Sequence, residues 1–134
     1  MINLLQEYNS TFRVYFEDTD LMGIVYHANY LKFFERARTE MLRSCGLSLS
    51  IMARSDTHFA IHNVNIIYKY PARLDDILNI KTLCANKRSC SFDFEQSMCN
   101  QLGQLICEAK IKVVCVDDNL KPKAMPGDMF LIKN

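Results

Sequence analysis

The chain has 134 residues, a formal net charge of +1 at neutral pH and 49% hydrophobic residues. This length predicts a single domain over residues 1–134, with a core large enough to fold without disulfide bonds or a structural metal. The balanced charge excludes a broad basic surface for nucleic acid, and the hydrophobic content excludes a disordered chain.

Residues 1–10 carry too little pattern to predict an element. Residues 11–16 alternate apolar and polar side chains, with Phe12, Val14 and Phe16 on one face. This period of two predicts a half-buried strand.

An acidic turn follows this strand at residues 16–29 and contains Glu17, Asp18, Asp20 and His27. It leads into a predicted helix, whose first backbone N–H groups have no partner within the helix and favour negative charge. The turn is therefore a candidate site for stabilising an anion. Acidic residues after a strand are more often solvated turn or capping residues, so spacing alone leaves both interpretations open.

A calcium loop is a third interpretation of the same turn, because Asp18 and Asp20 have the spacing of the first two ligands of an EF-hand. Met22 occupies the position of the third ligand, and Asn29 stands where the loop requires a glutamate. The sequence therefore predicts no calcium site.

The only long helical pattern in the chain comes next. Gly46 ends it, as is typical of the residue after a helix. The pattern predicts a helix of about 17 residues, roughly 25 Å long. Residues 47–57 leave a second, short helix open. The apolar stripe consists of Leu31, Phe34, Ala37, Met41, Leu42 and Cys45.

Four strands are predicted beyond residue 58, because β-branched and aromatic residues dominate in runs separated by turn residues. Their short connections imply antiparallel hairpins. One helix leaves much of such a sheet uncovered, so we expect at least a homodimer. The tail from residue 121 is expected on the surface, with residues 129–132 docked on a sheet edge. The four runs are residues 59–70, 77–87, 91–99 and 104–118.

The six cysteines form no Cys-x-x-Cys pair, which argues against a zinc or redox site. We interpret them as reduced thiols of a cytoplasmic protein. The first residues do not resemble a signal peptide, and no run approaches the 18 or so apolar residues of a membrane span. The sequence therefore predicts a cytoplasmic protein without a transmembrane segment.

One stretch closely resembles the signature of hotdog-fold acyl-CoA thioesterases of the 4-hydroxybenzoyl-CoA thioesterase family: residues 17–48, EDTDLMGIVYHANYLKFFERARTEMLRSCGLS. The likeness is to the YbgC type, which is associated with the Tol-Pal genes. Residues 70–80, YPARLDDILNI, and residues 113–126, VVCVDDNLKPKAMP, resemble the same group. The resemblance implies an α+β hotdog fold, in which an antiparallel sheet wraps one long helix, and a homodimer that pairs again to a homotetramer.

The activity implied by this resemblance is hydrolysis of an acyl-CoA thioester, with no metal or cofactor. The family's catalytic carboxylate falls on Asp20, which acts as nucleophile on the carbonyl or as general base for water. The oxyanion donor falls on the backbone N–H of His27, and in the YbgC type the imidazole is implicated as well. Glu17 and Asp18 match the motif without an assigned chemical role.

Five further residues are implied in substrate binding. Lys87 and Arg88 lie where family members place basic residues for the nucleotide phosphates of CoA, and a solvated hairpin turn is the alternative. Phe59, Ala60 and Ile61 would line the acyl or pantetheine channel, and ordinary strand packing is the alternative.

Two rival functions keep the same fold. A dehydratase acting on acyl-carrier-protein substrates would use His27 with an acid on the helix, such as Glu40, and would leave Asp20 idle. A non-catalytic assembly or thioester-binding module linked to cell-envelope proteins would tolerate the loss of Asp20. The sequence leaves the acyl group open, whether short, long or aromatic.

Overall fold

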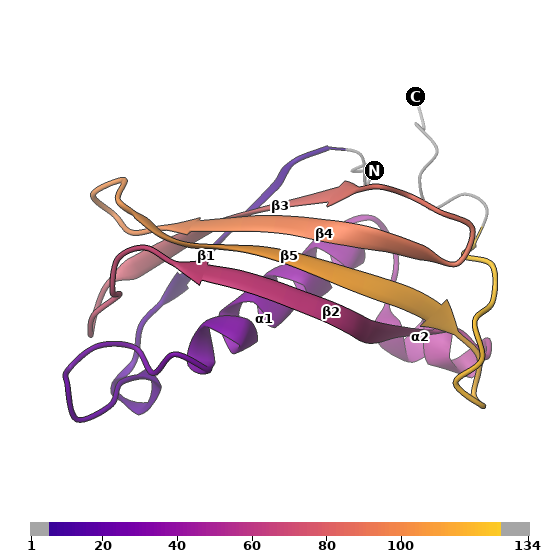
Figure 1. Ribbon diagram of the computed structural model, residues 1–134, viewed down its shortest axis with the longest axis horizontal. Coiled ribbons are helices and arrows are strands. Elements are labelled where there is room, and N and C mark those ends of the chain that lie inside the picture. The colour runs from indigo at the N-terminus through magenta and orange to yellow at the C-terminus, as the bar shows by residue number, and fades with distance from the viewer. Residues whose placement is uncertain (1–5, 127–134) are drawn as a thin grey trace.

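The computed structural model describes residues 6–126 and has five antiparallel strands in the order β1-β3-β4-β5-β2, with one long helix across one face (Figure 1). This arrangement confirms the α+β hotdog fold expected from the sequence. The elements are β1 (Tyr8–Arg13), α1 (Asn29–Ser44), α2 (Leu49–Arg54), β2 (His58–Tyr68), β3 (Ile77–Ala85), β4 (Ser91–Cys99) and β5 (Leu105–Val116).

Helix α1 lies where its apolar stripe predicts and ends at Ser44, and Gly46 follows it as the expected stop. The Gly46 backbone has a φ of +80°, a conformation that glycine adopts without a steric penalty. Its N–H donates to the Arg43 carbonyl at 3.0 Å, and the Leu47 N–H donates to the Leu42 carbonyl at 2.9 Å. These two bonds form a Schellman motif, which satisfies carbonyls that the helix leaves unpaired.

The first strand differs from its prediction at both ends. Strand β1 begins at Tyr8, in a segment to which the sequence pattern assigned no element, and it ends at Arg13. The chain then enters a short 3₁₀ turn, Phe16–Asp18. Because this turn breaks the alternation after Val14, Phe16 is 81% exposed rather than packed in the core.

A buried polar cluster joins α1 to the sheet. The Gln96 amide of β4 donates to the Phe34 carbonyl of α1 and to the Thr82 hydroxyl of β3, both at 3.0 Å. Its oxygen accepts a bond of 3.1 Å from the Arg38 guanidinium. Burial lowers the pKa of Arg38, and the charge of Glu35 raises it in part. Both the nitrogen and the oxygen of the Gln96 amide thus bond to α1, and these bonds fix how α1 is rotated against the sheet.

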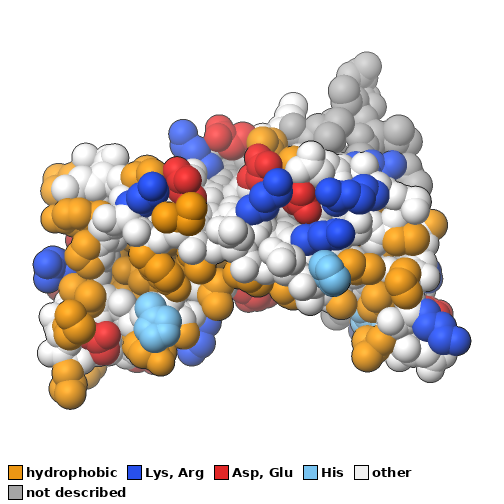
Figure 2. Space-filling model, viewed as in Figure 1, with side chains coloured by type: hydrophobic (Ala, Val, Ile, Leu, Met, Phe, Trp, Pro, Cys, Tyr) orange, Lys and Arg blue, Asp and Glu red, His pale blue; other side chains and the backbone are white. Residues whose placement is uncertain are grey.

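Strand β2 is one edge of the sheet and is exposed along most of its length. Its apolar residues Ile61, Val64 and Ile67 are each about half exposed, at 50%, 42% and 50%. Figure 2 shows hydrophobic side chains gathered along this border of the sheet, whereas charged side chains of both signs cover the middle strands. A long, unpaired and partly apolar edge is a surface on which another strand can pair.

The six cysteines are free thiols, as expected. Burial raises the pKa of Cys84 and of Cys107 to about 12, so both thiols stay protonated at neutral pH. In the tail, Met125 is buried rather than on the surface. The expected docking of residues 129–132 lies outside the described residues.

Candidate active site

The acidic loop, residues 16–28, folds back on itself between β1 and α1. Thr19 pairs with Val25 across the loop, and the Tyr26 N–H donates to the Asp18 carbonyl at 2.9 Å. The Val25 N–H donates to the Ala72 carbonyl at 2.8 Å, which ties the loop to the segment between β2 and β3. The loop therefore has one well-defined backbone path.

Asp18 holds this loop against α1. Its side chain is buried, with 6% of the residue exposed. One carboxylate oxygen accepts the Tyr15 N–H at 2.8 Å, and the other accepts the side-chain amide of Asn29, the first residue of α1, at 3.0 Å. With both oxygens bonded, Asp18 has a structural role, whereas Glu17 is exposed.

Asp20, the predicted catalytic carboxylate, begins a tight turn that closes at Gly23, whose φ is +76°. The Gly23 N–H donates to the Asp20 carbonyl at 3.0 Å, and the Met22 N–H donates to Oδ1 of Asp20 at 2.8 Å. Within the described residues, Oδ2 of Asp20 has no hydrogen-bond donor. The carboxylate is thus anchored through one oxygen and can react through the other.

The start of α1 presents two consecutive backbone donors. Among the residues that the structure describes, the N–H groups of His27 and Ala28 donate to no acceptor, in contrast with the Asn29 N–H, which donates to the Tyr26 carbonyl at 2.8 Å. The His27 side chain is exposed and lies against the Tyr26 ring, 4.5 Å between ring centres. Unpaired N–H groups at a helix start favour a developing oxyanion.

Two tyrosines, which the sequence interpretation missed, lie beside this helix start. The Tyr68 hydroxyl at the end of β2 donates to the His27 carbonyl at 2.8 Å. Its ring meets that of Tyr30 edge-on, 5.4 Å between centres. Burial raises the pKa of Tyr30, and among the smaller causes that raise it is the charge of Asp20.

The predicted channel residues occupy the other end of β2. Phe59 and Ile61 point to the side of α1, and they line a groove of about 170 Å³ between α1 and β2. Ala60 points to the opposite face of the sheet, so its side chain does not reach the groove. A neighbouring hollow of about 440 Å³ continues along α1 to Leu31.

The predicted phosphate-binding residues lie in the turn between β3 and β4. Arg88 is exposed, and its guanidinium is 3.7 Å from the buried carboxylate of Asp93. Asp93 also accepts the side-chain amide of Asn86 at 2.8 Å, which steadies the turn. Lys87 is exposed in the same turn.

Within one chain, the acidic loop and the helix start lie at one end of the sheet, whereas the channel and phosphate residues lie at the other end (Figure 1). Nine positions of β2 separate Phe59 from Tyr68, roughly 30 Å at 3.3 Å per residue. The turn that holds Lys87 and Arg88 lies at the same end as Phe59. A single chain therefore places Asp20 and the helix start at one end of the sheet, in one loop, and it does not bring either to the channel or phosphate residues.

The acid of the dehydratase alternative is far from His27 in the same chain. Glu40 follows His27 by thirteen residues, roughly 20 Å at 1.5 Å per helical residue. Its carboxylate forms an ion pair with Arg43 on the next turn. The geometry of one chain therefore gives no His27–Glu40 pair.

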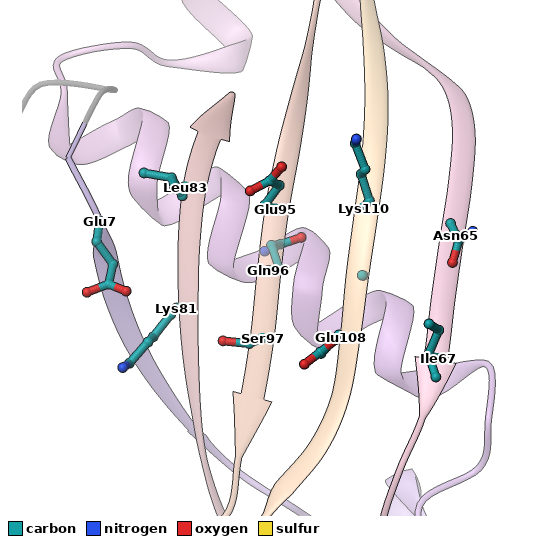
Figure 3. A pocket seen from close by; sticks show the side chains of 11 residues that line it. Glu7, Asn65, Ile67, Lys81, Leu83, Glu95, Gln96, Ser97, Glu108 and Lys110 are labelled. Carbon is teal, nitrogen blue, oxygen red and sulfur yellow. The ribbon is translucent and has the colours of Figure 1, made fainter. Parts of the chain in front are cut away.

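The opposite face of the sheet has a hollow of about 390 Å³ (Figure 3). Its lining combines charged, polar and apolar side chains, and the charged ones include Lys81, Glu95, Glu108 and Lys110 from three adjacent strands. In the part of the chain that the structure describes, no group of three His, Cys, Asp or Glu side chains could hold a metal ion. No helix in residues 6–126 is long and apolar enough to cross a membrane.

Comparison with known proteins agrees with this fold and loop. The family model of the thioesterase-like superfamily matches residues 14–131. The chain belongs to this superfamily. It is 45% identical over 115 residues to the acyl-CoA thioester hydrolase YbgC of Escherichia coli O6:H1, covering 85% of this chain and 86% of the relative. The resemblance drawn from the sequence motifs is thereby confirmed.

Two further relatives give the same family. The acyl-CoA thioesterase YbgC of Haemophilus influenzae is 41% identical over 120 residues, which cover 87% of each chain. A solved structure of a probable thioesterase from Bartonella henselae has a TM-score of 0.86 at 32% identity, and the match covers 90% of this chain and 100% of that one. The acidic loop and α1 thus belong to a fold used by thioesterases.

Proposed function

We propose that the protein hydrolyses the thioester of an acyl-CoA to the free acid and CoA. The observation that carries the proposal is the anchored carboxylate of Asp20 in the loop that leads to the unpaired N–H groups at the start of α1. The family membership and the relatives named acyl-CoA thioesterases support the substrate class.

In the proposed reaction the thioester carbonyl oxygen is placed at the N–H groups of His27 and Ala28. Asp20 either attacks the carbonyl carbon, forming an acyl anhydride that water then hydrolyses, or removes a proton from the attacking water. In both routes the carbonyl oxygen becomes negative, and the fixed N–H groups stabilise it without reorganisation. The C–S bond breaks and CoA leaves as its thiol after protonation.

The direct test offers the purified protein a panel of acyl-CoA esters while released thiol is monitored. Asp20→Asn should abolish thiol release, and Glu40→Gln, which changes an exposed acid paired with Arg43, should retain it. Equal rates in all three proteins would refute the role of Asp20. His27→Ala keeps the backbone donor, so a total loss of thiol release in that variant would assign the oxyanion role to the imidazole instead.

A single turnover in H₂¹⁸O with enzyme in excess tests the nucleophilic role of Asp20. An anhydride that water opens at the Asp20 carbonyl gives unlabelled acid and leaves the label on the Asp20 carboxylate, a result that a general base does not give. Labelled acid with an unlabelled enzyme results from a general base and also from an anhydride opened at the acyl carbonyl, and trapping of an acyl-enzyme with hydroxylamine distinguishes these two routes.

The proposed site is completed by a second copy of the chain that pairs through β2. Antiparallel pairing of two β2 edges places residue 59 of one copy near the Tyr68 end of the other. Phe59 and Ile61, with Lys87 and Arg88 at the same end of the sheet, would then approach the partner's helix start. The exposed apolar edge of β2 supports this pairing.

Mixed dimers test this arrangement. One partner carries Asp20→Asn and the other carries Lys87→Ala with Arg88→Ala. If each site draws on both chains, every mixed dimer has one intact site, and an equimolar mixture recovers about a quarter of wild-type activity. If each site lies within one chain, the mixture shows no recovery.

Three finer points remain predictions. Light scattering should give the mass of a dimer or a tetramer rather than of the 15.5 kDa chain. Fractionation of cells should recover the protein in the cytoplasm. A link to the Tol-Pal proteins predicts that they co-purify with this protein. Failure to co-purify would refute that link.

A further inference from the structure

Tyr68 forms a hydrogen bond with the backbone of the helix start. Among the described residues, it is the one side chain of a distant strand that does so. Its hydroxyl donates to the His27 carbonyl at 2.8 Å, across 41 residues of sequence. We propose that Tyr68 is a positioning residue, which orients the Ala28 N–H toward the oxyanion of the reaction. This inference rests on the proposed thioesterase function.

The link between the two atoms is the peptide group that joins residues 27 and 28. Because a trans peptide is planar, its C=O and N–H point in opposite directions. A hydrogen bond that fixes the His27 carbonyl therefore also fixes the direction of the Ala28 N–H. Such a bond also polarises the peptide, which makes its N–H a stronger donor.

Tyr68 is itself held firmly enough to transmit this constraint. Its backbone is paired with Cys107 of β5. Its ring packs edge-on against Tyr30, which is 3% exposed and whose hydroxyl accepts the Ala72 N–H at 3.0 Å. The same Ala72 binds Val25 of the acidic loop through its carbonyl. The tyrosine pair thus connects the sheet, the loop and the helix start.

The neighbouring donor is fixed by a different means. The His27 N–H belongs to the peptide whose carbonyl, that of Tyr26, accepts the Asn29 N–H at 2.8 Å. That constraint is local and survives a change at residue 68. Removing the Tyr68 hydroxyl should therefore disturb one of the two donors and leave the other in place.

The test compares Tyr68→Phe with Tyr70→Phe, since Tyr70 is 44% exposed and is likewise close to the end of β2. Loss of an oxyanion donor typically reduces kcat by 10²–10³, so loosening one donor should lower kcat about tenfold while KM changes little. Tyr70→Phe should keep wild-type kcat. Both variants should melt within a few degrees of wild type, because the aromatic ring that remains in Tyr68→Phe would still pack against Tyr30.

A spectroscopic measurement distinguishes positioning from loss of structure. An inert acyl-CoA analogue with a methylene group in place of sulfur keeps its carbonyl, whose ¹³C resonance reports polarisation by the donors. Tyr68→Phe should shift this resonance toward its position in free solution. A wild-type resonance and kcat in Tyr68→Phe, or a large fall in its melting temperature, would overturn the inference. Absence of thiol release from wild type would instead refute the proposed function.

Discussion

Replacement of Asp18 by alanine tests whether the acidic loop is held by this buried carboxylate. The change removes the acceptor of both the Tyr15 N–H and the Asn29 side-chain amide. A hydrogen bond to a charged group contributes about 1.5–3 kcal/mol. Both bonds are partly exposed to solvent, so we expect a combined loss of about 2–4 kcal/mol in the free energy of unfolding.

Two further variants calibrate this value. Asp18→Asn keeps one carbonyl oxygen and so one of the two bonds, and it should cost about 1–2 kcal/mol. Glu17→Gln changes the adjacent, exposed carboxylate and should leave stability within about 0.5 kcal/mol of wild type.

Urea denaturation followed by circular dichroism gives the free energies, with all proteins at one concentration because an oligomer's stability depends on it. Thiol release measured on the same samples should fall in Asp18→Ala, since a loosened loop no longer holds Asp20 beside the helix start. The reasoning is wrong if Asp18→Ala and Glu17→Gln unfold at the same urea concentration.

Two other predictions concern the core. Since burial raises the pKa of Cys84 and Cys107 to about 12, the folded chain keeps two protons that the unfolded chain loses above pH 9. The free energy of unfolding should therefore fall by about 1.4 kcal/mol per thiol per pH unit from pH 9 toward pH 12. Urea midpoints measured over this pH range should fall less steeply in the double variant Cys84→Ala with Cys107→Ala. Arg38→Met and Gln96→Leu each leave a buried polar partner without its hydrogen bond. The double variant should therefore lose about 1–2 kcal/mol less free energy of unfolding than the sum of the two single variants, and additive losses would contradict this coupling.

The elements with strong local patterns could be predicted from the sequence. Helix α1 has a continuous apolar stripe and a glycine just after its end, and both signals can be recognised from neighbouring residues alone. Strand β1 was misplaced because the side chains of Tyr8 and Ser10 are only half buried at the edge of the sheet, which weakens the alternation. Phe16 was misplaced because the 3₁₀ turn of the loop interrupts the strand.

The candidate site divides in the same way. Asp20 and His27 lie in one contiguous motif, so both could be named from the sequence of one short loop. Tyr68 instead reaches His27 across 41 residues of sequence, through the tertiary placement of the end of β2 beside the helix start. An aromatic residue in a strand is ordinary strand composition, so nothing local to residue 68 distinguishes it.

The separation of the predicted site residues into two groups follows from the sheet itself. Successive antiparallel strands place the turn between β3 and β4 at the end opposite the loop between β2 and β3. No rotation of a side chain spans roughly 30 Å of strand, and bending the sheet would break its ladder. A second copy paired in parallel along the β2 edge, in the same register, would also leave the two groups apart. In the proposed dimer, an antiparallel pairing of β2 edges would reverse the direction of one sheet, and this reversal would bring Phe59 and the basic turn of one copy to the Asp20 end of the other.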